Sequence, residues 1–288
     1  MEIIVGKYSG FCNGVKYTVD KANEILENNK SIYSLGDIVH NEIVINSLKE
    51  KGLIVKDNIE SIPNNSKVII RAHGEKLDTY KKAKEKNLEV LDLTCGKVKS
   101  IHNKILSKKD EFFIIIIGKN NHPETIAHKT YSDNSFIVEN KSDVINAYNS
   151  FLNSNLEKVY IVAQTTFNQD LFDEIVNEIE YIFPVEILVD KTICNATNLR
   201  QEEVKEIASK VDKMIIIGGK NSSNTKELEN IAKLYCRDVY LIQSLKDLNE
   251  DNFNNDDIIG ISAGASTPKE VIISVVNSLN SLHKIKKK

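Results

Sequence analysis

The sequence of 288 residues has no tryptophan, four prolines and only four cysteines. Its apolar runs stay well short of the roughly 20 residues that a membrane-spanning helix needs. Residues 2–10 begin as a strand and lack the pattern of a signal peptide. The net charge of −3 gives no sign of nucleic-acid binding. We therefore expect a cytoplasmic protein without disulfides, whose cysteines are available for metal binding or chemistry.

Several local motifs that indicate a function are also missing. No CxxC pair is present, which argues against a local zinc knuckle. The chain has neither the GxxxxGKS/T loop of nucleotide triphosphatases nor a GxGxxG dinucleotide fingerprint. If this chain carries out redox chemistry, we therefore expect its electrons to come from a partner.

Three of the cysteines, Cys12, Cys95 and Cys194, stand in the same sequence context. Each follows a short β-branched apolar run and a turn-prone stretch. Each is followed by apolar residues three to five positions apart, as on one face of a helix. Each cysteine is therefore predicted to lie where a strand passes into a helix N-terminus. Backbone N–H groups and the helix dipole favour an anion there, and a thiolate is an anion.

The surroundings of these cysteines repeat along the chain. The cysteines are 83 and 99 residues apart, which suggests three copies of one unit. A glycine that closes a second apolar run lies 24, 23 and 24 residues beyond them, at Gly36, Gly118 and Gly218. Polar residues follow each glycine by four positions, and others follow a third apolar run in each copy: His40, His122 and Ser222, then His73, Thr165 and Ser266.

This repeat predicts an α/β fold of three similar units. We expect them to cover residues 1–93, 94–192 and 193–288. The third unit lacks a last strand, which residues 2–5 are able to supply, so that residues 1–12 close a three-part ring. The polar residues all follow strand ends, where open parallel sheets bind ligands. The alternative is three unrelated strand–loop–helix junctions, which the matched spacing disfavours.

Smaller features complete this plan. A loop that contains Pro63 is expected after Gly52 and before a strand over residues 67–71. Thr225 is the expected N-cap of a helix over residues 226–235. The basic residues 284–288 are expected to be a solvated tail.

Three remote cysteines on equivalent turns suit a metal cluster held between the units. Iron–sulfur clusters use cysteine thiolates, usually four, so three would leave one iron without a protein ligand. An open metal position is what a catalytic site needs. The alternative is that these cysteines are buried and structural. Cys236 breaks the register and is interpreted as a core residue.

The polar loops suggest an anion pocket. Histidine, hydroxyl and amide donors, together with inward-turned backbone N–H groups, suit a small anion such as a phosphate ester. The candidate residues are His40, His73, His122, Ser222, Ser223, Asn224 and Ser266. A lone histidine is more often structural, but three in matching loops favour a function.

Glu124 is the candidate acid. It is the only carboxylate in these loops besides Asp37. A carboxyl beside a metal-bound oxygen can donate a proton to a leaving hydroxyl. The alternative is an exposed glutamate in the first turn of a helix after Pro123, where the helix dipole stabilises its negative charge.

The chain resembles a known family at nine motifs, which occur in order over nearly its whole length. It is similar to the 4-hydroxy-3-methylbut-2-enyl diphosphate reductases of the LytB type, the terminal enzymes of the methylerythritol phosphate route to isoprenoids. The motifs are CNGV (12–15), VHN (39–41), RAHG (71–74), DLTC (92–95), NHPE (121–124), QTT (164–166), CNAT (194–197), SSNT (222–225) and AGASTP (263–268).

The resemblance implies a fold, a cofactor and a reaction. It implies three α/β domains in a pseudo-threefold arrangement around a central [4Fe–4S] cluster, held by Cys12, Cys95 and Cys194. It implies that the polar loop residues named above bind a diphosphate, that Glu124 relays protons and that Thr165 helps to hold the substrate hydroxyl. The reaction is a two-electron reductive dehydroxylation that yields isopentenyl and dimethylallyl diphosphate. A ferredoxin or flavodoxin is the expected electron donor.

Two other functions fit parts of the pattern. A non-redox enzyme such as quinolinate synthase would use the open iron only as a Lewis acid, and it would work without a reductant. A cluster-based redox sensor would bind a partner and need no small-molecule pocket. The many histidine, serine and asparagine residues in the loops argue against the sensor.

Overall fold

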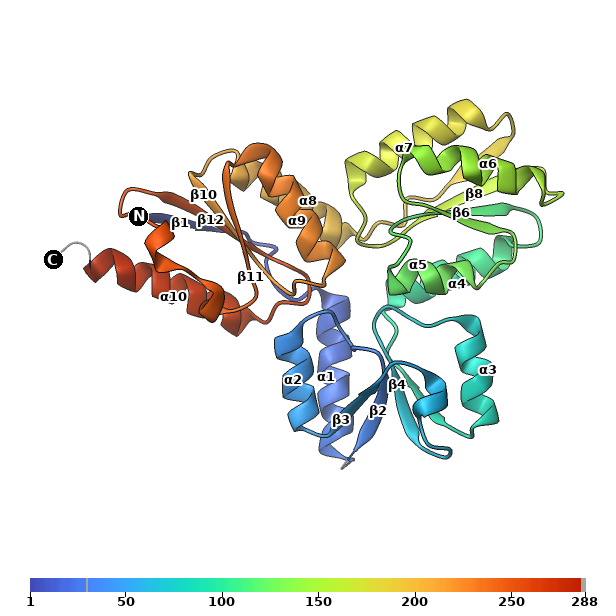
Figure 1. Ribbon diagram of the computed structural model, residues 1–288, viewed down its shortest axis with the longest axis horizontal. Coiled ribbons are helices and arrows are strands. Elements are labelled where there is room, and N and C mark those ends of the chain that lie inside the picture. The colour runs from blue at the N-terminus through green and yellow to red at the C-terminus, as the bar shows by residue number, and fades with distance from the viewer. Residues whose placement is uncertain (30, 286–288) are drawn as a thin grey trace. The chain divides into compact units, whose positions relative to one another are not determined.

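The computed structural model describes residues 1–29 and 31–285. It contains two compact units, drawn in Figure 1. The first unit comprises Met1–Lys16, Val39–Asn46 and Asn195–Lys288, and the second comprises Tyr17–Ile38 and Ser47–Cys194. Of the expected basic tail, residues 284–285 belong to the last helix, and residues 286–288 lie outside the described residues.

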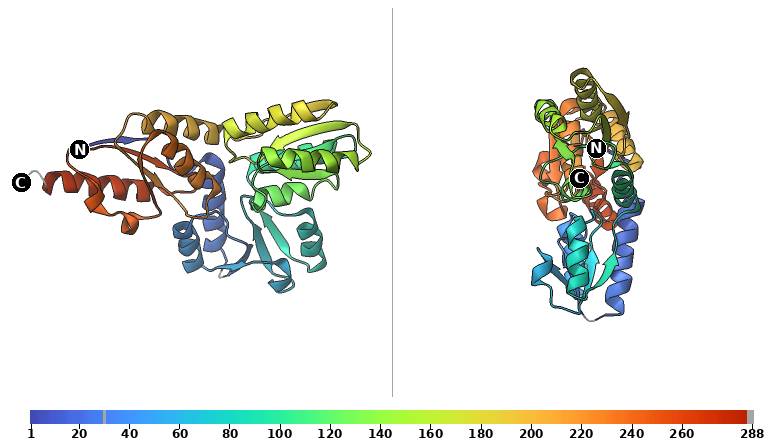
Figure 2. Two further views of the ribbon diagram at one scale, coloured as in Figure 1. Left: turned by 45° about the horizontal axis from the view of Figure 1, so that its top comes forward. Right: turned by 90° about the vertical axis from the view of Figure 1, so that its right-hand side faces the viewer.

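The first unit contains one sheet of four parallel strands. Their order is β1 (Glu2–Val5), β12 (Ile258–Ala263), β10 (Lys213–Ile217) and β11 (Asp238–Ile242). The N-terminal strand therefore completes a sheet whose other strands come from the last third of the chain, as the repeat predicts. Figures 1 and 2 show this strand, in blue, beside the orange strands and α10 (Lys269–Ile285).

Alternate residues of β10 face opposite sides of this sheet. Ile215 and Ile217 pack in a core with α10. Met214 and Ile216 pack on the other face, in a core formed with α8 (Asn195–Ala208) and α9 (Ser223–Tyr235). Helices cover both faces, which is why the strands of this parallel sheet read as continuous apolar runs.

The second unit contains two sheets of four parallel strands each. One has the order β3 (Leu53–Lys56), β2 (Ile32–Leu35), β4 (Lys67–Ile70) and β5 (Glu89–Asp92). The other has the order β7 (Ser135–Val138), β6 (Phe113–Ile117), β8 (Lys158–Ala163) and β9 (Glu186–Val189). The helices along this part of the chain are α3 (Leu77–Glu85), α4 (Gly96–Lys108), α5 (Pro123–Lys129), α6 (Val144–Leu152) and α7 (Gln169–Ile182).

All five residues of β6 are buried. Phe113, Ile115 and Ile117 pack in one core with α6 and α7, while Ile114 and Ile116 pack in another with α4. The remaining helices are α1 (Asn13–Glu27) and α2 (Glu42–Glu50).

The three sheets share one strand order. In each, the strand that follows the cysteine helix is central, the next strand along the chain is at one edge, and the third and fourth continue on the other side. The fourth strand is β5, β9 or β1. The predicted α/β fold of three similar sheets is confirmed.

Two local predictions are wrong. The segment between Gly52 and the strand at residue 67 is not all loop, because it contains strand β3, which pairs with β2 from Leu53 opposite Ile32. A run of four apolar residues is too short to reveal a strand by periodicity, and pairing with β2 stabilises it. The N-cap of α9 is Ser222, whose side chain accepts a hydrogen bond from the N–H of Thr225. Among the described residues, no helix is long and apolar enough to cross a membrane.

Candidate active site

Each of the three matched cysteines lies at the start of a helix. Cys95 is the N-cap of α4, and Cys12 and Cys194 immediately precede α1 and α8. All three are half-buried, and none of them forms a disulfide with another described residue. The predicted position at a strand-to-helix transition is therefore confirmed.

One hydrogen bond recurs at all three cysteines. The N–H of Cys12 donates to the carbonyl of Ala265 over 3.1 Å, and that of Cys95 donates to Ala72 over 3.0 Å. The N–H of Cys194 donates to the carbonyl of Thr165 over 3.0 Å. The three acceptors lie in the loops after β12, β4 and β8. Each cysteine turn is thus joined to the polar loop of its own sheet.

Cys236 differs from the other cysteines in every respect. It follows α9, is 5% exposed and packs within the apolar core of the first unit. Its sulfur lies 3.5 Å from the carbonyl oxygen of Asp212 and 3.6 Å from that of Asp238. Burial raises the pKa of this thiol, which disfavours the thiolate that metals bind.

The polar loops of the first unit gather around the N-terminus of α9. Ser222, Ser223 and Asn224 are each at most 7% exposed. Neither the amide nitrogen nor the amide oxygen of Asn224 has a hydrogen-bond partner among the described residues. An unpaired buried amide is costly, and the N-terminus of a 13-residue helix favours an anion. Both features indicate a ligand at this place.

The loop that carries His40 is fixed within the same unit. The hydroxyl of Ser266 donates to the carbonyl oxygen of His40 over 3.2 Å. The backbone of Gly219 lies so close to that oxygen that a Cβ atom there would collide with it. The loops after β2, β10 and β12 therefore support one another.

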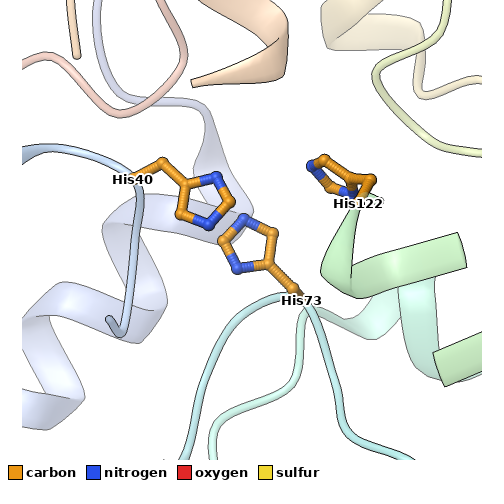
Figure 3. A group of neighbouring side chains, drawn as sticks. All are labelled: His40, His73 and His122. Carbon is orange, nitrogen blue, oxygen red and sulfur yellow. The ribbon is translucent and has the colours of Figure 1, made fainter. Parts of the chain in front are cut away.

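In the second unit, His73 and His122 lie side by side. Their ring centroids are 5.5 Å apart and their planes meet at 82°. Figure 3 draws both rings. Figure 3 also labels His40, which belongs to the first unit. Nδ1 of His122 accepts the N–H of Glu124 over 3.2 Å, so Nε2 carries the hydrogen of the neutral ring. Burial lowers the pKa of His122 to about 4, which keeps the ring neutral at neutral pH.

Glu124 is buried, with 1% of its surface exposed. Its Oε1 accepts the N–H of Thr165 over 2.6 Å, and its Oε2 accepts the hydroxyl of Thr165 over 2.8 Å. Nε2 of His128 lies 3.3 Å from Oε1. Burial alone would raise the pKa of Glu124, but the hydrogen bonds and charge of His128 and the N–H of Thr165 hold it below its ordinary value. The alternative of an exposed first-turn glutamate is wrong.

Comparison with known proteins decides the family. The model of the LytB protein family matches residues 3–280. The chain belongs to this family. A LytB relative, the 4-hydroxy-3-methylbut-2-enyl diphosphate reductase of Aquifex aeolicus, is 38% identical, covering 98% of this chain and 97% of the relative. The protein of the same name from Clostridioides difficile is also 38% identical, over 98% of this chain and all of the relative.

Solved LytB structures have the same fold. The E-1-hydroxy-2-methyl-but-2-enyl-4-diphosphate reductase of Plasmodium falciparum matches with a TM-score of 0.88 and 31% identity, over 97% of this chain and 88% of that one. A second structure, described as (E)-4-hydroxy-3-methyl-but-2-enyl diphosphate reductase, the terminal enzyme of the non-mevalonate pathway, matches with a TM-score of 0.69 and 38% identity. It covers 98% of this chain and 100% of that one.

Sequence reasoning missed two parts of this LytB site. Gln164 is fully buried, accepts the N–H of Lys119 over 3.0 Å and so joins the loops after β6 and β8. His128 lies one helical turn after Glu124 and contacts it. The signal for His128 was the spacing of four residues, which places two side chains on one helix face. Nothing in the sequence shows that this face is buried.

Proposed function

We propose that this chain is a 4-hydroxy-3-methylbut-2-enyl diphosphate reductase. The enzyme removes the hydroxyl of its allylic substrate with two electrons and yields isopentenyl and dimethylallyl diphosphate, in the last step of the methylerythritol phosphate pathway. The observation that carries the proposal is the set of three half-buried cysteines at helix starts, each joined by the same backbone hydrogen bond to a polar loop. The LytB match over residues 3–280 supports it.

Cys12, Cys95 and Cys194 are the proposed ligands of one [4Fe–4S] cluster, with one iron not bound by protein. The donor set fits, because the three thiols are half-buried and placed at helix starts, where thiolates are favoured. When bound, the cluster supplies single electrons and a Lewis-acidic iron. Cys236 is excluded from this set because its sulfur is enclosed by backbone carbonyls.

The residues proposed to bind the diphosphate are hydrogen-bond donors from several separate loops. The chain has no single phosphate-binding loop. They are His40, His73, His122, Ser222, Ser223, Asn224 and Ser266. The buried amide of Asn224 supports this role, since a phosphate oxygen would accept the hydrogen bond that its nitrogen otherwise lacks. His122 is kept neutral by burial, so it donates through Nε2 without adding charge. An anchored diphosphate fixes the reacting end of the substrate.

Glu124 is the proposed proton donor to the leaving hydroxyl, and Thr165 is proposed to assist. The Thr165 hydroxyl already donates a hydrogen bond to Oε2 of Glu124. It is therefore placed to bridge this carboxyl and a substrate oxygen. The lowered pKa makes Glu124 a ready proton donor once it is protonated, and its burial keeps bulk water from taking the proton in place of the substrate.

The electron donor, the domain boundaries and the cellular location are also proposals. We propose that an external one-electron donor, a ferredoxin or flavodoxin, reduces the enzyme. The domain boundaries 1–93, 94–192 and 193–288, and the cytoplasmic location, also stay proposals.

An anaerobic assay of the purified, cluster-loaded protein tests the function. Reduced viologen supplies electrons, and its oxidation is followed after addition of 4-hydroxy-3-methylbut-2-enyl diphosphate. We expect substrate-dependent oxidation and isoprenoid diphosphate products. No oxidation, with iron and sulfide confirmed in the sample, would instead favour a hydro-lyase that uses iron only as a Lewis acid.

A further inference from the structure

A second buried histidine stands behind Glu124. His128 lies one turn further along α5, and its Nε2 is 3.3 Å from Oε1 of the glutamate. The side chains are 0% and 2% exposed respectively. Because both residues belong to one short helix, this contact does not depend on movement of other elements. His128 has no role in the proton transfer from Glu124 and Thr165 proposed for the reaction.

The surroundings of His128 leave Glu124 as its proton partner. His102 of α4 approaches edge-on, with ring centroids 5.0 Å apart. His102 itself stacks on Tyr131 at 4.0 Å. Burial lowers the pKa of His102 to about 3, so that ring stays neutral and does not compete for protons near neutral pH. Nδ1 of His128 has no partner among the described residues.

The remaining charged groups lie further away or are already paired. His122, at the start of α5, acts on Glu124 through its charge only when protonated. Asp92 and Lys99 affect His102 and form an ion pair of 2.6 Å with each other. The strands β6 and β7 that pack against α5 contribute no ionisable side chain.

The proposed reaction needs more protons than one carboxyl holds. Two electrons enter, one proton leaves with the hydroxyl as water, and a second proton forms the new C–H bond. Glu124 carries one proton at a time. Among the described residues, Thr165 and His128 lie within hydrogen-bond distance of its carboxyl. Of these, only an imidazole takes and releases a proton near neutral pH.

We propose that His128 re-protonates Glu124 within a single turnover. The inference rests on the proposed function. After Glu124 has given up its first proton, the Nε2–H of the His128 imidazolium passes its proton to Oε1 and the ring becomes neutral. Glu124 then delivers the second proton. After product leaves, solvent restores one proton to His128 and one to Glu124, so each cycle balances two electrons with two protons. His128 is therefore a proton-supplying residue that acts through Glu124.

The test replaces His128 by glutamine, which still donates a hydrogen bond but does not titrate. In the viologen assay, we expect His128→Gln to lower kcat by about 10- to 100-fold with little change in KM. We also expect it to change the shape of the pH profile of kcat, because glutamine has no ring proton to exchange. The matched control is His102→Phe, which keeps a ring against Tyr131 and should retain both kcat and the profile. Wild-type kcat and profile in His128→Gln would overturn the relay.

A second readout does not depend on turnover. Infrared difference spectra follow the carbonyl stretch of the protonated Glu124 carboxyl during a pH titration, with Glu124→Gln identifying the band. Loss of the cationic neighbour should move protonation of Glu124 to higher pH in His128→Gln, and an unmoved titration would contradict the coupling. His128→Asn serves if the glutamine variant does not fold.

Different results would overturn the reductase function and the His128 relay. A wild-type enzyme that oxidises no viologen overturns the proposed reductase function, and the relay with it. An active wild type together with an unaffected His128 variant overturns the relay alone.

Discussion

At the scale of single residues, the site depends on which polar groups are buried and what they contact. Glu124 and Cys236 are both buried, but the carboxyl is held by two side chains, whereas the thiol lies in an apolar core near backbone carbonyl oxygens. The first arrangement stabilises an ion and the second disfavours one. Replacing Glu124 should therefore impair function, whereas replacing Cys236 should not.

Glu124→Gln should nearly abolish turnover. The amide has the same shape, so it keeps the backbone hydrogen bond from Thr165 and the substrate site around it. It has no proton to give, and loss of a general acid costs roughly 10²–10⁴ in kcat. Steady-state kinetics should show unchanged KM, and calorimetry should show unchanged binding. Normal turnover would remove Glu124 from the mechanism.

Cys95→Ser should lose most of the bound iron, because a serine hydroxyl is a poor ligand for an iron–sulfur cluster. Cys236→Ser is the matched control and should keep the iron content of the wild type. Its new hydroxyl can donate to the carbonyl of Asp212 in place of the thiol. Iron and sulfide analysis of both proteins checks this. Iron loss in the Cys236 variant would contradict the proposed ligand set.

At the scale of elements, loops that follow different strands hold one another in place. In the first unit, Ser266 and Gly219 both contact the carbonyl oxygen of His40. In the second unit, Gly118 and Gln164 hold the loops after β6 and β8 close together. A Cβ atom at Gly118 would lie only 2.8 Å from the Gln164 side chain. Small residues at these positions allow the close approach.

Gly219→Ala should weaken substrate use without removing any donor. The added Cβ collides with the His40 carbonyl, which is backbone and moves only with its loop. A displacement of about 1 Å at a positioning residue costs on the order of 10- to 100-fold in kcat/KM. Gly96→Ala is the control, because its Cβ would meet no atom within 4 Å. Equal kcat/KM in the two variants would show that the His40 loop tolerates the shift.

Much of this arrangement follows from the sequence, for physical reasons. The buried central strands are apolar over their whole length, and the repeated spacing from Cys95 to Gly118 to Thr165 places polar residues after their ends. The edge strand β3 escaped prediction because a short apolar run is decided by pairing, not by its own pattern. The burial of Glu124 and His128 depends on packing against α4, which no local pattern contains.

At the scale of the whole molecule, buried histidines are distributed unequally. The second unit contains His102 and His122, whose pKa values burial lowers to about 3 and about 4. The only histidine side chain described in the first unit is the half-buried His40. A group that is harder to protonate in the folded state than in the unfolded state makes folding sensitive to acid. The second unit should therefore be the acid-sensitive one.

The pH window follows from these values. An unfolded histidine titrates near 6.5, so between about pH 6.5 and pH 4 the unfolded chain binds protons that the folded chain does not. Stability is full above this window and is lost as the pH falls through it. At pH 5 each buried ring should cost about 2 kcal/mol of unfolding free energy. Carboxylates still titrate little at this pH, which makes it a suitable comparison with pH 7.

We expect urea unfolding of the wild type, followed by circular dichroism, to shift to lower urea concentration between pH 7 and pH 5. His102→Phe should shift less, by the share of one histidine, because phenylalanine retains the stack on Tyr131 and has nothing to protonate. Hydrogen exchange should show that α4 and α5 open before α8 and α9 at pH 5. Comparing two proteins with the same cluster cancels the acid sensitivity of the iron site. Parallel losses in both proteins would mean that His102 is already charged in the folded state, contrary to its buried and unpaired position.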